Sequence, residues 1–212
     1  LTGDELDVVV DRTIARVELI RQLEFTGSID VRVISRAEYR ERSSGGTPTA
    51  RVERLREQQH EAMFLVGENE SVAEAYAGLY GGSVTGSYSP ATDTLVIVSD
   101  TAAPTVDTRT LAHELVHALQ DQQFGWGRAD GPDDRAALNG LREGDATYVD
   151  TLYDERCEAE WSCLPTPESS DTADEYNPGL LAVVTQPYVD GAQFVHELRQ
   201  RGGWDAVDAA YD

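Results

Sequence analysis

The order of apolar and polar residues predicts a helix and then a strand at the start of the chain. From Leu6 to Ile20, apolar residues recur at the three- to four-residue spacing of an amphipathic helix, which we expect to end at Gly27. Residues 28–35 instead alternate between apolar and polar, which is the period of a half-buried strand.

The rest of the chain continues these two patterns. Helices are expected over residues 50–66, about 72–79, about 133–161 and 186–201, with a short one after Gly202-Gly203. A further helix is expected to start near residues 105–107 and to continue through the apolar stripe that follows. Strand-like runs, VTGSYSP and TLVIVSD, are joined by a turn at residues 90–93. Segments 43–49 and 162–178 have loop composition. Helices, a small sheet and then more helices are typical of an α+β fold rather than of βαβ units.

One helical segment carries the pattern H-E-x-x-H, formed by His113, Glu114 and His117. It lies in TRTLAHELVHALQDQQF, where apolar residues recur at helical spacing and where Asp107 or Thr108 can cap the helix. Residues four apart share one helix face, so both imidazoles can reach a single metal ion. Glu114 stands beside the first ligand and can act as a general base. The pattern indicates a zinc site.

A catalytic zinc ion usually has three protein ligands, so a third ligand is expected downstream. The remaining histidines, His60 and His196, do not continue the spacing H-x-x-G-x-x-H, which excludes the metzincin arrangement. Glu143 is the better candidate, because it lies 26 positions after His117, which leaves room for a loop and a returning helix. Small residues at Gly144 and Ala146 would let that helix approach the motif helix closely.

HELVHALQDQQF followed by the E-G-x-A helix resembles the gluzincin group of zinc metallopeptidases over roughly residues 84 to 205. The resemblance implies that His113, His117 and Glu143 hold Zn²⁺ and that Glu114 is the general base. It also implies a zincin-like α+β domain with a small mixed sheet packed on the active-site helix, followed by a mainly helical C-terminal part. The first 80 residues have no counterpart in this group.

A second part of the resemblance concerns the helix after residue 186. The run YVDGAQFV is similar to a gluzincin helix whose tyrosine donates a hydrogen bond to the oxyanion, which implies this role for Tyr188. Tyr148 and His196 are the competing candidates. The strand TLVIV resembles the edge strand on which these enzymes bind an extended peptide.

One position departs from the thermolysin subgroup of the gluzincins. Thr147 stands where that subgroup has an aspartate that orients a zinc-bound histidine. Orientation of the histidines must therefore come from another residue, and Asp121, Asp145 and Asp150 are the candidates. The tryptophans at 126, 161 and 204 are expected to be packing residues.

Charge and cysteine content restrict the partners and the location. The 212 residues include 39 acidic and 17 basic ones, for a net charge of −22, and every basic residue is arginine. Such a surface repels nucleic acid and anionic membranes, and no apolar run approaches the roughly 20 residues of a membrane-spanning helix. The composition is similar to that of haloarchaeal proteins, with an arginine-biased genome as the alternative explanation. Cys157 and Cys163 favour a local disulfide over two free thiols, and hence an extracellular or cell-surface location.

The expected activity is zinc-dependent hydrolysis of a peptide or protein substrate. No amine-binding motif such as G-x-M-E-N is present, which favours an endopeptidase. Two other functions stay open: a catalytically inactive zinc-binding or interaction domain that keeps the zincin fold, and a zinc amidohydrolase acting on a cell-surface component. We expect residues 81–212 to form the catalytic part and residues 1–80 to pack on the same domain.

Overall fold

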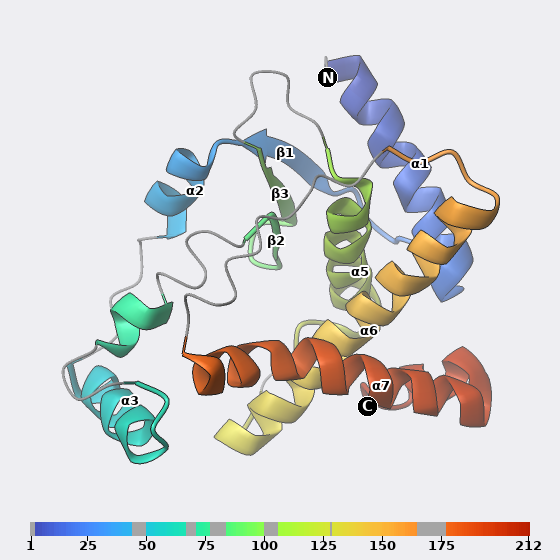
Figure 1. Ribbon diagram of the computed structural model, residues 1–212. Helices are drawn as coiled ribbons and strands as arrows, with labels where there is room; N and C mark the ends of the chain where they lie inside the picture. Colours follow the sequence, from blue (N-terminus) through green and yellow to red (C-terminus); the bar gives the residue numbers. More distant parts are fainter. Residues whose placement is uncertain are drawn as a thin grey trace. The chain divides into compact units, whose positions relative to one another are not determined.

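The computed structural model describes residues 3–43, 50–66, 71–76, 84–99, 106–127, 129–164 and 177–212. Within them the fold is α+β with a small mixed sheet, which confirms the predicted class (Figure 1). The chain forms two compact units: Leu1–Ile34 with Thr85–Pro167 and Gln186–Asp212, and Ser35–Val84 with Glu168–Thr185. The units alternate along the chain, whereas the sequence indicated one division near residue 80. The expected loops at 43–49 and 162–178 lie largely outside the described residues.

The first helix of the first unit, α1 (Gly3–Arg21), ends earlier than the predicted stop at Gly27. Gln22 adopts a left-handed backbone conformation with φ of 60°, and its N–H donates to the Glu18 carbonyl at 2.8 Å. A residue in this conformation terminates a helix because the next turn cannot continue. The chain then runs from Gln22 to the sheet.

The sheet contains β1 (Asp30–Ile34), β2 (Gly86–Ser89) and β3 (Thr94–Val98) in the order β1-β3-β2. The β1 and β3 strands are parallel, while β2 and β3 form an antiparallel pair across the predicted turn at residues 90–93. The run TLVIV is β3, so the prediction that it is an edge strand is wrong. Four consecutive residues of β3 are buried, which is typical of a central strand covered on both faces. The edge on the antiparallel side is β2.

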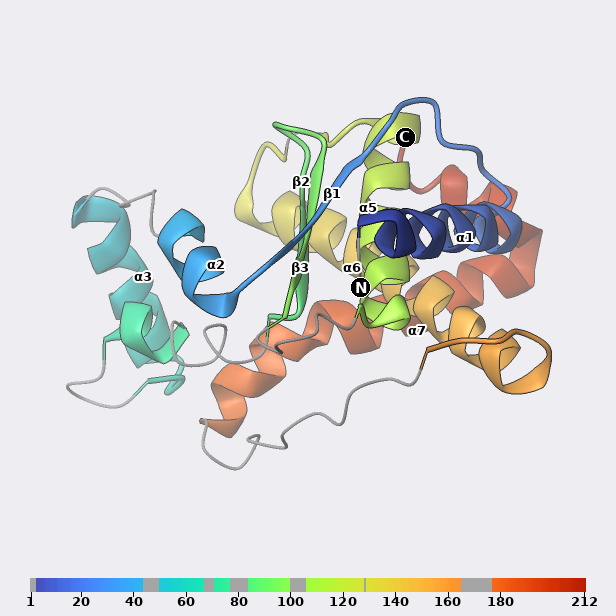
Figure 2. The same ribbon diagram turned by 90° about the horizontal axis from the view of Figure 1, so that it is seen from above.

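Three long helices complete the first unit: α5 (Thr108–Phe124), α6 (Pro132–Ala159) and α7 (Pro178–Asp208), whose residues from Gln186 onward belong to this unit. The α5 helix contacts both α6 and the strands β2 and β3 (Figures 1 and 2). The α7 helix begins earlier than predicted and has non-helical backbone at Gly202 and Gly203, where the sequence predicted a break. The shared core contains Val17, Leu95, Ile97, Leu111, Leu115, Leu119, Val149, Tyr153, Val195 and Val207.

The second unit contains α2 (Arg36–Ser43), α3 (Ala50–Ala62) and a short helical stretch over residues 72–76. His60 is buried here with both ring nitrogens in contact with polar groups. Nδ1 lies 2.8 Å from the Arg56 carbonyl and Nε2 lies 3.0 Å from the Tyr76 hydroxyl. His60 is therefore a structural histidine of this unit.

A disulfide joins Cys157 to Cys163 at the end of α6, which confirms the predicted local bond. Arg16 of α1 packs on the same end of α6. Its guanidinium donates to the Tyr153 hydroxyl at 3.1 Å, and its central carbon lies 4.5 Å from the centroid of the Trp161 ring. Among the described residues, none of the helices has the length and apolar character that crossing a membrane requires.

Candidate metal centre

The α5 helix positions the H-E-x-x-H residues. Asp107 caps its N-terminus by accepting from the Arg109 N–H at 3.1 Å and from the Thr110 hydroxyl at 2.9 Å. One turn separates His113 from His117, so their rings lie on the same face with centroids 4.9 Å apart. The predicted helix and one of its two predicted caps are confirmed.

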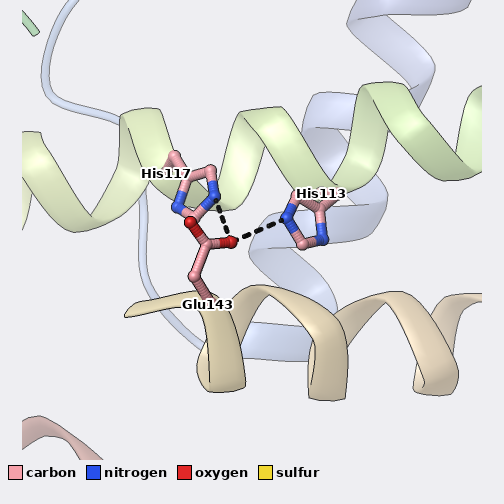
Figure 3. A group of neighbouring side chains, drawn as sticks. All are labelled: His113, His117 and Glu143. Atoms are coloured by element: carbon pink, nitrogen blue, oxygen red, sulfur yellow. Dashed lines mark ion pairs between the residues drawn. The ribbon is translucent and has the colours of Figure 1, made fainter. Parts of the chain in front are cut away.

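The α6 helix brings Glu143 opposite these two histidines (Figure 3). One carboxylate oxygen, Oε2, lies 3.4 Å from Nε2 of His113 and 3.4 Å from Nε2 of His117. The donor atoms of all three residues lie within 4.8 Å of one another. The predicted third ligand therefore lies beside the other two, across the consecutive helices α5 and α6.

This geometry fits a zinc ion. Zn–N and Zn–O bonds of about 2.0–2.1 Å at tetrahedral angles place two donor atoms about 3.3 Å apart, close to both observed separations. Oε2 of Glu143 is buried, and no group of the described residues makes a well-formed hydrogen bond to it. A buried acceptor facing two imidazole nitrogens is the environment that a shared cation satisfies.

The charges of the three residues are coupled. Burial opposes ionisation of Glu143, but its contacts with the two histidines outweigh burial and hold its pKa below the usual range. Burial likewise opposes protonation of His117, but the close contact with the negatively charged Glu143 outweighs burial and raises the pKa of His117 to about 9. In the metal-free protein the Glu143 carboxylate therefore attracts a proton to the place where a cation would be held.

Glu114 lies between the motif helix and the sheet, with only 8% of its surface exposed. Burial raises its pKa, and the two nearby histidines oppose that rise. The backbone N–H of Tyr88 in β2 donates to its carboxylate. The strand can come this close because position 86 is glycine: a Cβ on Gly86 would lie 2.8 Å from Cγ of Glu114 and 2.7 Å from Cγ2 of Thr110.

The last of the three candidate aspartates, Asp150, lies beside His113. Asp150 follows Glu143 by two helical turns, and its Oδ2 lies 3.9 Å from Nδ1 of His113. Arg109, one turn before His113, donates to Asp150 at 2.8 Å and fixes the carboxylate from the other side. Burial raises the pKa of Asp150 to about 6, against the opposing effect of Arg109. Asp121 instead accepts from the Tyr88 hydroxyl at 2.9 Å.

Sequence reasoning missed the partner of His117. Gln120 lies one turn further along α5, and its Oε1 is 3.1 Å from Nδ1 of His117. The sequence feature that could have identified Gln120 is its position on the buried face of the motif helix, where apolar residues are usual.

Tyr188 lies on α7 beside the metal ligands. Its ring is nearly parallel to that of His113 at a centroid separation of 6.1 Å, and the residue is 37% exposed. The competing candidates contact each other instead: the Tyr148 hydroxyl lies 3.3 Å from Nδ1 of His196 and accepts from Arg199 at 3.0 Å.

A contact between glycines holds α7 at this place. A Cβ on Gly144 would lie 2.2 Å from the carbonyl carbon of Gly191, so the backbones of α6 and α7 nearly touch. The sequence predicted that Gly144 would permit close approach to the motif helix, and this was wrong. Gly144 faces Gly191 of α7, whereas Glu143 points from α6 toward the histidines of α5 (Figure 3).

Trp126 differs from the other two tryptophans because it lies at the border of the centre. Its ring is 6.2 Å from that of His117 and 6.1 Å from that of Tyr88, and the Arg142 guanidinium lies 4.2 Å from its centroid. Trp161 and Trp204 pack elsewhere, each against arginine side chains.

The chain matches no family model, and it shows no significant similarity to a curated protein or to a solved structure.

Proposed function

We propose that this protein is a zinc-dependent peptidase of gluzincin type, acting on peptides or proteins as an endopeptidase. One observation carries the proposal: two imidazole nitrogens and a glutamate oxygen converge within 4.8 Å, with a buried glutamate on the adjacent helical position. Two histidines and a carboxylate form one of the ligand sets of catalytic zinc sites. A purely structural zinc site would have four protein ligands, whereas the three that the described residues bring together leave a position for water and substrate.

Each residue of the centre has a role in this proposal. His113, His117 and Glu143 bind the metal through Nε2, Nε2 and Oε2. Zinc, when bound, acts as a Lewis acid that lowers the pKa of a water and polarises a carbonyl group. The Glu114 carboxylate accepts a proton from the attacking water and transfers it to the leaving amine nitrogen. The Tyr188 hydroxyl donates a hydrogen bond to the oxyanion that develops on the substrate carbonyl.

The sheet supports a peptide substrate rather than a compact small molecule. As an edge strand, β2 can pair with an extended chain through the outer backbone groups that Glu114 leaves available. It passes beside Glu114, since the Tyr88 N–H bonds that carboxylate. An extended peptide added to β2 would therefore lie along the proton-transferring residue. In this proposal β2, rather than the run TLVIV, is the strand that binds the extended peptide.

The disulfide supports action outside the cell, because such bonds persist in oxidising compartments. The net charge of −22 and the absence of lysine support adaptation to high salt. Cleavage should therefore be assayed in both high and low salt.

The test compares Glu114→Gln and Glu143→Ala with the wild-type protein on an unfolded protein substrate, with and without a chelator. Glu114→Gln should keep stoichiometric zinc and lose hydrolysis by roughly 10²- to 10⁴-fold, the contribution of a positioned acid–base group. Glu143→Ala should lose the metal. Glu155→Gln, which changes an exposed glutamate of α6, is the matched control and should behave as wild type.

Each alternative predicts a different result. An inactive interaction domain would bind zinc without cleaving any protein substrate, and a cell-surface amidohydrolase would cleave non-peptide amides in preference. Full activity in Glu114→Gln would refute the proposed mechanism.

A further inference from the structure

His117 receives its support from a buried chain of polar groups that crosses the first unit. Its Nδ1 lies 3.1 Å from Oε1 of Gln120, an oxygen that can only accept. Nδ1 therefore carries a hydrogen, which leaves Nε2, the nitrogen that faces Glu143, as the one that can bind a metal ion once its own proton is displaced. The tautomer of His117 depends on which way the Gln120 amide points.

Two contacts set the orientation of that amide. Nε2 of Gln120 donates to the Arg142 backbone carbonyl at 3.0 Å and to Oδ2 of Asp145 at 3.3 Å. Both partners are acceptors, so a flipped amide would direct its oxygen at two other oxygens and lose both bonds. Asp145 thereby helps to set the tautomer of His117 without contacting it.

Asp145 in turn depends on α1. It is fully buried, and both of its oxygens contact Nε of Arg21, at 3.0 and 3.2 Å. The Tyr211 hydroxyl donates to it at 2.9 Å. Arg21 is also buried, pairs with Asp208, and lies 4.4 Å from the centre of the Trp204 ring. A buried carboxylate is stable only when charge and hydrogen bonds compensate it, and Arg21 supplies both.

We propose that Gln120, Asp145 and Arg21 are positioning residues that hold His117 in the tautomer whose Nε2 binds the metal. This inference rests on the proposed metal centre but not on peptide hydrolysis. It makes α1 and the C-terminal residues part of the apparatus that sets metal affinity. Residues that orient a ligand in this way typically change metal affinity by roughly 10- to 100-fold when removed.

The first experiment measures Zn²⁺ affinity by competition with a chromogenic chelator in Gln120→Met and in Gln122→Met. Gln122 is the matched control, because it lies on the same helix and its Oε1 accepts from the backbone N–H groups of Thr26 and Gly27. Gln120→Met should bind zinc roughly 10- to 100-fold more weakly. Gln122→Met should keep wild-type affinity even though it also loses hydrogen bonds and some thermal stability.

A second variant tests the far end of the network. Arg21→Met alone would leave Asp145 buried and unpaired, so it is combined with Asp145→Leu, which removes both charges together. Gln120 then keeps only the Arg142 carbonyl. Zinc affinity should fall, by less than in Gln120→Met, while the protein remains folded.

The imidazole ¹⁵N spectrum of the zinc-loaded wild-type protein requires no variant. It should show His117 protonated at Nδ1 and metal-bound at Nε2, and the reverse assignment would overturn the inference. Wild-type affinity in Gln120→Met would overturn it as well while leaving the metal centre intact. A wild-type protein that binds no zinc would refute the centre itself, which keeps the two failures distinguishable.

Discussion

Replacing Gly191 with alanine should impair hydrolysis while leaving the metal in place. A Cβ at this position would lie 2.1 Å from the Gly140 carbonyl oxygen and 3.0 Å from Cα of Gly144. Relief of this overlap to ordinary contact requires α7 to move outward by roughly 1 Å. Tyr188 lies one turn before Gly191, so it would move away from His113 together with the helix.

The magnitudes follow from that displacement. Overpacking typically costs about 1–3 kcal/mol, and alanine recovers about 1 kcal/mol of helix preference over glycine. The free energy of unfolding should therefore fall by up to about 2 kcal/mol. A misplacement of about 1 Å at a positioning group can lower a reaction rate by roughly 10²-fold. The metal ligands lie on α5 and α6, so zinc affinity should stay close to wild type.

The assay combines kcat, zinc affinity and thermal unfolding, with Gly140→Ala as the control. A Cβ on Gly140 would meet nothing within 4 Å, so this variant should be active and at least as stable as wild type. Wild-type kcat in Gly191→Ala would refute the idea that the glycine contact positions a group needed for the reaction. Loss of zinc in the folded variant would show that the added methyl group displaces α6 rather than α7.

Three further predictions concern the centre itself. Tyr188→Phe should lower kcat by roughly 10²-fold with little change in KM, because the variant loses only the hydrogen bond to the oxyanion. An unchanged kcat would mean that a residue other than Tyr188 donates this bond. Asp150→Asn should weaken zinc binding by roughly 10-fold or more in a competition assay, because His113 loses its orienting carboxylate. In the metal-free protein the pKa of His117 is raised to about 9, so zinc must displace a proton at pH 7. Zinc affinity should therefore keep rising with pH until about 9, whereas a plateau just above pH 6.5 would contradict the His117–Glu143 coupling.

The ligand set was predictable because it depends on short-range geometry. His113 and His117 are one helical turn apart, and any helix brings them together. Glu143 required only that a second helix return along the first, and the loop of glycines and polar residues between them made that return plausible. Asp150 could be named only as one of three aspartates that could contact a histidine. The choice among them depends on how α6 is rotated about its own axis, which the sequence does not reveal.

The sheet order was not predictable in the same way. The alternation in VTGSYSP and the continuous apolar run in TLVIV predict strands, but the pairing of β1 with β3 joins residues about sixty positions apart. Burial of four successive residues in β3 is the feature that identifies a central strand, and it was visible in the sequence as an unbroken apolar run. That run was better evidence for a central strand than for an edge.

Under the proposed function, metal binding and catalysis would depend on different contacts in this fold. The three ligands require only α5 and α6 at their observed separation. Glu114 additionally requires β2 to pass beside it, which Gly86 permits, and Tyr188 requires α7 to cross α6, which Gly191 permits. Both glycines are distant in sequence from H-E-x-x-H, so a motif search does not include them. A chain with the same ligands but a larger residue at either position should bind zinc and hydrolyse poorly, which is how this fold would give rise to an inactive relative.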